Sequence, residues 1–181
     1  MTHRELGLTA TTLIVAGSET SNYNHLHTTH TQQANPSDTA ATILSGLIYL
    51  LLSNPPVLEE LTSAIRTDFN PTETPSPAQL QQHEYLNAVL KEALRLYPPA
   101  PDMLFRTTAV EPAMVAGRLV PPHTSVTMNL WAAHRSPENF YRPAEFLPER
   151  WMGNAPTEFD GDDRDVFRPF STGPRDCVGK K

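Results

Sequence analysis

The sequence predicts a mainly α-helical fold that carries a small β-sheet, an α+β arrangement. Apolar residues recur at helical spacing in the stretches before Pro98, which is typical of amphipathic helices. Most of the 18 prolines lie from Pro98 onward, and proline interrupts helices and restricts strands to short pieces. Hydrophobic residues make up 39% of the 181 residues, so the composition is not that of an intrinsically disordered chain.

Three helices are expected in the first part of the chain. The first occupies residues 5–20, and a second, strongly apolar helix occupies residues 40–53. The third runs over residues 55–69, because Asn54 can cap it and the prolines that follow fit its first turn. Its inward face is expected to carry Leu58, Leu61 and Ile65.

A turn-rich connector over residues 70–77 precedes a fourth helix at residues 85–97. Helical spacing in this segment relates Leu86, Leu90, Ala93 and Tyr97. Pro98 and Pro99 follow directly and end the helix, because proline cannot continue the backbone hydrogen bonding.

The chain after Pro98 is expected to alternate short strands with loops. A short helical turn is expected at residues 131–136, and the remainder up to Phe170 is predicted to be loop. The acidic stretch over residues 158–165 is interpreted as a solvated loop without a functional role. Short strands are predicted at residues 103–108, 115–120 and 125–129, with a turn near Gly117.

Composition excludes several classes of function. The net charge of −6 argues against a nucleic-acid partner. No secretory signal is present, and the longest apolar run, residues 43–52, is far shorter than the ~20 residues that span a bilayer. We therefore expect no membrane span in this chain. A single cysteine without a secretory signal also fits a reducing compartment.

The only cysteine, Cys177, lies in a segment that follows the pattern F-x-x-G-x-R-x-C-x-G over residues 170–179. A lone cysteine cannot form an internal disulfide, so it acts as a nucleophile, as a single thiolate ligand, or as an inert buried side chain. The surroundings favour the ligand. Gly173 permits a positive φ and a close approach by a flat group, and Arg175 can pair with a carboxylate.

This segment resembles the heme-binding loop of the cytochrome P450 family, the heme-thiolate monooxygenases. The resemblance implies that Cys177 is the axial ligand of a heme b iron. It also implies that Phe170, Gly173, Arg175 and Gly179 shape the heme-binding loop around that ligand.

A second motif joins Glu92 and Arg95, which are three residues apart on one helix face. Taken alone, such a pair is an ordinary surface ion pair. It resembles the family's K-helix motif, and the segment 146–151 resembles the family segment that supplies a second arginine, here Arg150. The resemblance implies a buried structural triad that holds the Cys177 loop in place.

A third motif, at residues 16–20, resembles the oxygen-binding part of the family's I helix. The resemblance implies that Glu19 and Thr20 deliver protons during oxygen activation. The alternative is a threonine that caps or back-bonds within a helix. Arg106, at the start of the first strand after the fourth helix, is expected either to contact a heme propionate or to be a solvated strand-end arginine.

The resemblance covers nearly the whole chain and is closest to a fungal, microsomal type. It implies that residues 1–181 form a partial domain, an incomplete cytochrome P450 fold that runs from the I helix to the heme-binding loop and lacks the membrane anchor. Residues 21–39 interrupt the family pattern, are rich in Asn, Thr, His and Gln, and are predicted to be a disordered insertion. A retained intron and a genuine insertion are both open. Within it, His25, His27 and His30 are spaced like metal ligands, but no zinc site is expected there.

The resemblance implies a monooxygenase that inserts one O2-derived oxygen atom into a small apolar organic substrate in secondary metabolism. NADPH electrons would arrive through a cytochrome P450 reductase. Full-length members would lie on the cytosolic face of the endoplasmic reticulum, whereas this chain without an anchor is expected in the cytoplasm. Two alternatives are an inactive, truncated remnant that cannot hold heme on its own, and a heme-binding sensor or carrier.

Overall fold

The computed structural model describes residues 36–70, 72–101, 105–173, 176–177 and 179, with side chains from Thr39 onward. The helix predicted at residues 5–20, and most of the insertion predicted at residues 21–39, therefore lie outside the described residues. The mainly α-helical class with a little β-structure is confirmed.

Helix α2 (Pro36–Ser53) begins four residues earlier than predicted. Those residues belong to the segment 21–39, which was predicted to be a disordered insertion; its last four residues, 36–39, are helical instead. The reason is local, because proline suits the first helical position and the Ser and Asp that follow it suit a first turn. No single helix among the described residues meets the length and apolarity of a membrane span, although α2 from Thr39 together with the next helix, α3 (Pro55–Asp68), bent by 107°, does so as a pair.

Helix α3 (Pro55–Asp68) ends one residue before the predicted end. Asn54 occupies the N-cap position, but its side chain makes no capping hydrogen bond. Its Nδ2 donates instead to the Leu50 carbonyl at 2.7 Å. Of the three residues predicted to face inward, Leu61 is buried and Ile65 packs against the core, whereas Leu58 is half-buried and is not part of the core, where Val57 lies instead.

Helix α4 (Pro77–Gln82) was not predicted; it begins at the last residue of the predicted connector and occupies part of the segment between that connector and the next predicted helix. It begins with a capping box, in which the Ser76 hydroxyl accepts from the Gln79 N–H and the Gln79 side chain accepts from the Ser76 N–H. This reciprocal cap satisfies two backbone donors and allows a helix as short as six residues.

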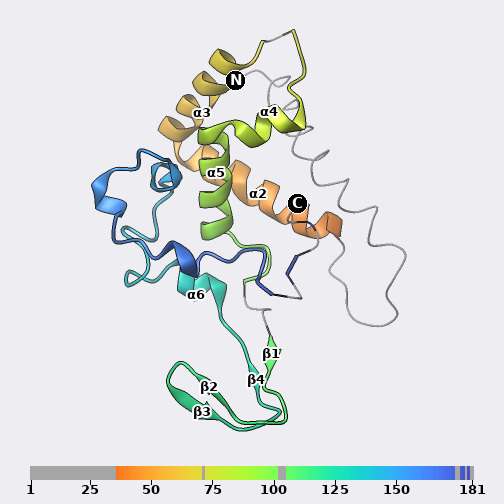
Figure 1. Ribbon diagram of the computed structural model, residues 1–181. Coiled ribbons are helices and arrows are strands. Elements are labelled where there is room, and N and C mark those ends of the chain that lie inside the picture. The colour runs from red at the N-terminus through yellow and green to blue at the C-terminus, as the bar shows by residue number, and fades with distance from the viewer. Residues whose placement is uncertain (1–35, 71, 102–104, 174–175, 178, 180–181) are drawn as a thin grey trace.

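Helix α5 (Glu84–Leu96) is the centre of the molecule, and the longer helices and the chain after helix α6 (Leu130–His134) lie around it (Figure 1). One face of α5 packs on α2 and α3 through a hydrophobic core that also includes Phe146. The approach of α2 is close, because a Cβ built on Gly46 would lie 2.4 Å from Tyr97 Cδ1. The buried apolar members of this core are Leu47, Val57, Leu61, Tyr85, Leu86, Val89, Ala93, Leu96 and Phe146.

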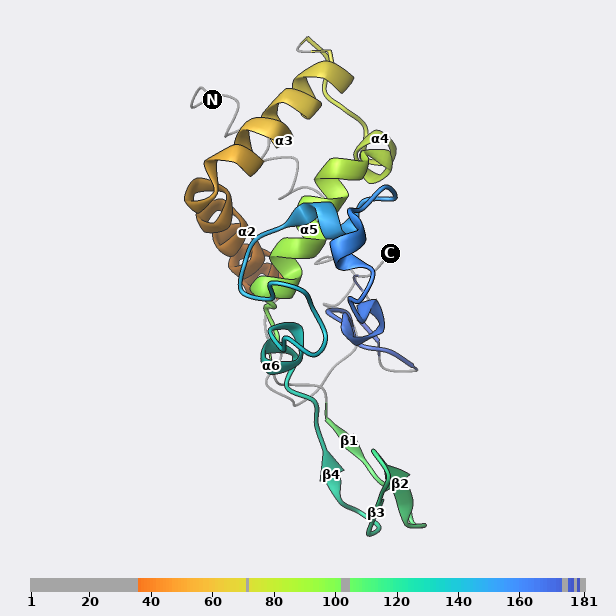
Figure 2. The same ribbon diagram turned by 90° about the vertical axis from the view of Figure 1, so that its left-hand side faces the viewer.

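Among the described residues, the β-structure consists of two antiparallel pairs rather than one small sheet. Strand β1 (Arg106–Thr107) pairs with β4 (Ser125–Val126), and β2 (Ala113–Val115) pairs with β3 (Arg118–Val120). The turn predicted near Gly117 is confirmed, with φ of 47° at Ala116 and 75° at Gly117, and it divides the strand predicted at residues 115–120 between β2 and β3. This hairpin extends away from the helical body in both views (Figures 1 and 2).

After helix α6 (Leu130–His134), three 3-10 helices occupy a region predicted to be loop: η2 (Pro148–Trp151), η3 (Thr157–Phe159) and η4 (Arg164–Val166). The helical turn predicted at residues 131–136 corresponds to α6. Figure 2 shows the chain after α6 running back along α5, with η2 against that helix. This return places the last part of the chain beside the charged face of α5.

Candidate functional site

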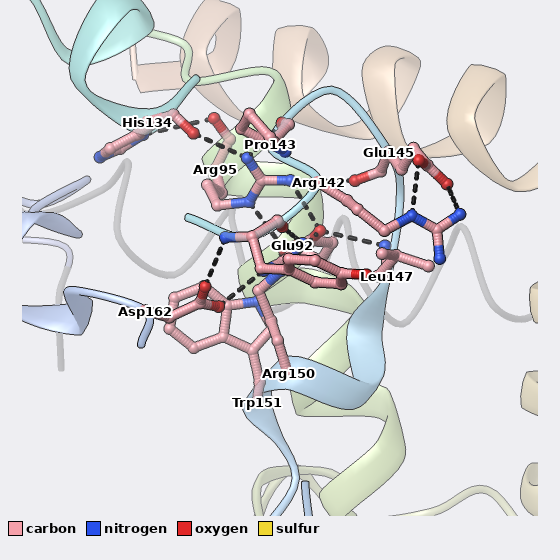
Figure 3. A network of polar contacts seen from close by, with 11 residues as sticks. Glu92, Arg95, His134, Arg142, Pro143, Glu145, Leu147, Arg150, Trp151 and Asp162 are labelled. Atoms are coloured by element: carbon pink, nitrogen blue, oxygen red, sulfur yellow. Dashed lines mark hydrogen bonds and ion pairs between the residues drawn. The ribbon is translucent and has the colours of Figure 1, made fainter. Parts of the chain in front are cut away.

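Glu92 is the centre of a buried polar network (Figure 3). Its Oε1 accepts from Arg95 Nη2 at 2.7 Å and from Arg150 Nε at 3.1 Å. Its Oε2 accepts from Arg95 Nε at 2.9 Å and from Trp151 Nε1 at 2.8 Å. The Leu147 N–H donates to Oε1 at 3.0 Å. The carboxylate thus receives five hydrogen bonds, four of them from side chains.

Arg95 lies on the same face of α5 as Glu92. It contacts the returning chain, which is the segment that runs back along α5 after α6. Its Nη1 donates to the carbonyl oxygens of His134 and Pro143, each at 2.7 Å, and its Nη2 donates to that of Glu145 at 3.0 Å. The side chain is fully buried. A guanidinium carries donors in a fixed fork, so these contacts fix three points of the loop after α6 relative to α5.

Arg150 connects three segments. Its Nε contacts Glu92, its Nη2 donates to the Tyr141 carbonyl at 2.9 Å, and its Nη1 lies 2.6 Å from Asp162 Oδ2. The Asp162 side chain is 0% exposed, and its Oδ1 accepts from the Tyr141 N–H at 2.6 Å. The interpretation of residues 158–165 as a solvated loop is therefore wrong at Asp162.

Aromatic rings cover the network. The Arg95 guanidinium lies 5.2 Å from the centroid of the buried Phe140 ring, and the Arg150 guanidinium lies 4.8 Å from that of Phe159. Trp151 stacks at a tilt on Phe167, with centroids 4.6 Å apart. Cations over aromatic faces are stabilised, and the rings also keep water away from the ion pairs.

Burial lowers the pKa of His134, which lies at the end of α6 with its Nδ1 3.3 Å from the Arg95 carbonyl. The nearby Arg95 charge lowers the pKa further. In the opposite direction, burial raises the pKa of Glu149, and the neighbouring carboxylates of Glu60 and Glu92 add to this effect. Both groups are therefore biased toward their neutral forms, as expected for ionisable groups near a desolvated cluster.

The Cys177 loop is attached to the sheet region by Arg106. The Arg106 Nη2 donates to Ser171 Oγ and to the Thr172 carbonyl, each at 3.0 Å. Inside the loop, the Cys177 N–H donates to the Phe170 carbonyl at 2.8 Å, and Gly173 adopts a φ of 82°. Cys177 carries a free thiol and is exposed.

The structure thus brings Glu92, Arg95 and Arg150 into contact. Arg106, at the start of β1, is exposed and contacts the loop through its side chain. Glu19, Thr20 and Arg175 lie outside the described residues, as do His25, His27 and His30. Among the residues that the structure describes, no group of three His, Cys, Asp or Glu side chains could hold a metal ion.

Two members of the network were missed from the sequence, Trp151 and Asp162. The sequence signal for Trp151 was its position directly after Arg150. In the structure, a tight 3-10 turn carries both side chains toward α5. Asp162 had no usable signal, because it is one of several acidic residues in its segment and only the folded chain distinguishes it.

Comparison with known proteins identifies the class to which this fold and site belong. The family model described as Cytochrome P450 matches residues 12–181, and the chain belongs to this family. Cytochrome P450 monooxygenase astD of Aspergillus oryzae is 40% identical over 181 residues, which is all of this chain and 31% of that relative. Averantin hydroxylase of Aspergillus parasiticus is 42% identical over the same span, 32% of its length. Fusicoccadiene 8-ol C-16-hydroxylase of Phomopsis amygdali is 43% identical over 144 residues, which is 80% of this chain and 27% of the length of that relative.

The chain spans about a third of the length of the curated relatives it matches. Heme is the cofactor that this family implies, and the described loop fits it in donor chemistry. An exposed free thiol is available as a thiolate ligand to iron. A Cβ built on Gly173 would meet nothing within 4 Å among the described residues, so the loop is open at that residue.

Proposed function

We propose that this chain supplies the cysteine-ligated side of a heme-thiolate monooxygenase. One observation carries the proposal: the only cysteine is exposed and free, on a loop that Arg106 holds through two hydrogen bonds. A thiol kept at the surface and fixed at its backbone is suited to bind a metal rather than to pack in a core. When bound, heme supplies the oxidative chemistry, and the protein supplies its position.

Each predicted site residue has a role under this proposal. Cys177 is the axial ligand, and Phe170, Gly173 and Gly179 shape the loop around it. Arg175 pairs with a propionate, and Arg106 contributes by holding the loop. Glu19 and Thr20 hold and pass protons on the opposite side.

Glu92, Arg95 and Arg150 take no part in the chemistry under this proposal. They hold the returning chain on α5, and with it the segment that leads to the Cys177 loop. Their mutual contacts and complete burial support this structural role.

The substrate and partners follow from the relatives. Their names describe hydroxylations of averantin and of a fusicoccadiene alcohol, so we infer a small, largely apolar organic substrate in secondary metabolism. One oxygen atom from O2 would enter that substrate, with NADPH electrons delivered by a cytochrome P450 reductase at the endoplasmic reticulum membrane.

Heme loading through Cys177 tests the proposal directly. The chain is expressed, supplied with heme, reduced and exposed to CO, beside a matched Cys177→Ser variant. The expected result is the far-red-shifted Soret band of a thiolate complex in the parent chain and its loss in the variant. An unchanged band in Cys177→Ser would show that this cysteine is not the ligand.

The competing candidate is an inactive remnant that cannot hold heme on its own. It is favoured by one observation, that the matched relatives are about three times as long as this chain. The same experiment separates the two, because a remnant takes up no heme in either form. Monooxygenase activity requires, in addition, turnover with a reductase, and the role of Thr20 predicts that Thr20→Ala uncouples electron consumption from product formation.

A further inference from the structure

The charges of the buried triad do not balance by themselves. Glu92 contributes one negative charge, and Arg95 and Arg150 contribute two positive charges, with all three side chains 0–1% exposed. An uncompensated buried charge is strongly destabilising. The Asp162 carboxylate, 2.6 Å from Arg150 Nη1 and 0% exposed, brings the total to zero (Figure 3).

We propose that Asp162 is the fourth charged member of this cluster and a positioning residue for the Cys177 loop. The second part rests on the proposed function of Cys177. No other aspartate of the acidic stretch resembles it. Asp160 and Asp163 are exposed residues, and Asp165 forms an exposed pair with Arg168, in which the aspartate side chain is 93% exposed.

Asp162 occupies the point at which the returning chain meets the network. One oxygen binds Arg150 on η2, and the other accepts the Tyr141 N–H from the loop after α6. The next residue continues the attachment, because the Asp163 N–H donates to the Asn139 carbonyl at 2.7 Å. Asp162 therefore ties its own segment to two others.

From this anchor the chain runs directly to the Cys177 loop. It passes through η4, and Phe167 then packs on Trp151, which itself donates to Glu92. A few residues further, the Phe170 carbonyl accepts the Cys177 N–H. Asp162 thus fixes the start of the segment that ends in the loop, while Arg106 holds the loop from the sheet region.

The first test compares Asp162→Asn with Asp160→Asn, a matched change at an exposed site, and with Leu61→Ala, which weakens the helical core. Amide hydrogen exchange is followed by mass spectrometry without heme, in peptides that contain Cys177 and in peptides from α3. If Asp162 is a local anchor, amide exchange in the Cys177 peptides should be about tenfold faster in Asp162→Asn than in the parent chain. Exchange in the α3 peptides should stay unchanged, since local opening does not require global unfolding. Equal acceleration in both peptides, or none, would overturn the positioning role.

A second experiment applies even where Asp162→Asn leaves little folded protein. Arg150→Gln alone makes the cluster net negative, and adding Asp162→Asn restores neutrality. The folded fraction in urea should therefore rise when Asp162→Asn is added to Arg150→Gln. In the parent chain the same change should lower the folding equilibrium constant by about a hundredfold. Additive losses in the double variant would refute the charge-balance argument.

Neither measurement uses heme, so the two proposals fail separately. A negative result here contradicts the role of Asp162 and leaves ligation by Cys177 to its own spectroscopic test. Conversely, a Soret band that survives in Cys177→Ser would contradict the role of Cys177 as the iron ligand. The charge balance at Asp162 would still be decided by the urea experiment.

Discussion

Replacing Glu92 by glutamine should be among the most damaging conservative changes in this chain. The side chain keeps its size but loses its charge, in a fully buried position that receives five hydrogen bonds. A glutamine retains one acceptor oxygen, so its NH2 group must face donors that previously met a carboxylate oxygen. If the NH2 replaces Oε2, those donors are Arg95 Nε and Trp151 Nε1.

The size of the effect follows from the stranded charge. Without the Glu92 carboxylate, Asp162 is the remaining acid of the cluster and pairs with Arg150, so Arg95 loses its carboxylate partner and the buried cluster becomes net positive. Breaking a buried ion pair from one side destabilises a protein by about 3–5 kcal/mol. That is a large part of the ~5–15 kcal/mol that holds a typical domain together. With an m-value of about 2 kcal/mol per molar urea, the midpoint should fall by about 2 M.

Urea unfolding followed by far-UV circular dichroism measures this change. Glu145→Gln is the matched control, because Glu145 also pairs with an arginine three residues away, Arg142, but both side chains are nearly half exposed. Exposed pairs contribute little, since water already solvates both partners. Similar midpoints for Glu92→Gln and Glu145→Gln would refute the argument that burial gives the cluster its strength.

Three further predictions concern its surroundings. Gly46→Ala should destabilise by about 1–3 kcal/mol, because the new methyl group overlaps Tyr97. In thermal unfolding, adding Tyr97→Ala to Gly46→Ala should reduce this destabilisation, because the overlap is removed. Gly161→Ala should have no effect, since a Cβ at Gly161 meets nothing. Trp151→Phe should lose about 1.5–3 kcal/mol in urea unfolding, because its ring still packs while the buried carboxylate loses a donor. Glu149 has a pKa raised by burial, so its charged form opposes folding; Glu149→Gln should be more stable than the parent at neutral pH, and a pH series should show the gap closing as acidification protonates the native glutamate.

Much of the helical part could be predicted, because its causes are local. The spacing of apolar residues and the prolines after Tyr97 are visible in the sequence and define α5 within one residue at each end. Other features depend on competition between local options. Asn54 could cap α3, but its side chain binds the preceding turn instead. The short α4 depends on one capping box that the prolines around it obscured.

The site divides in the same way. The spacing of Glu92 and Arg95 implies that the two side chains are neighbours on a helix, and the resemblance supplied Arg150 as their partner. Asp162 could not be chosen in this manner, because its partner Arg150 is held in place by a different part of the chain. Net charge offers the one route to it, since a buried cluster with two arginines and one glutamate requires another acid.

The network also explains how one helix can position a loop that it does not carry. Arg95 binds carbonyls of the chain from α6 to Glu145, Glu92 binds the Leu147 N–H and the side chains of η2, and Arg150 binds Tyr141 and Asp162. The contacts are thus spread along the returning chain, and most of them involve backbone atoms. Because backbone carbonyls are present whatever the side chains are, such a network can hold a long irregular segment of varied sequence while it requires a few charged residues to stay unchanged. The loop of Cys177 lies at the end of that segment, so the loss of any of these contacts would displace the loop.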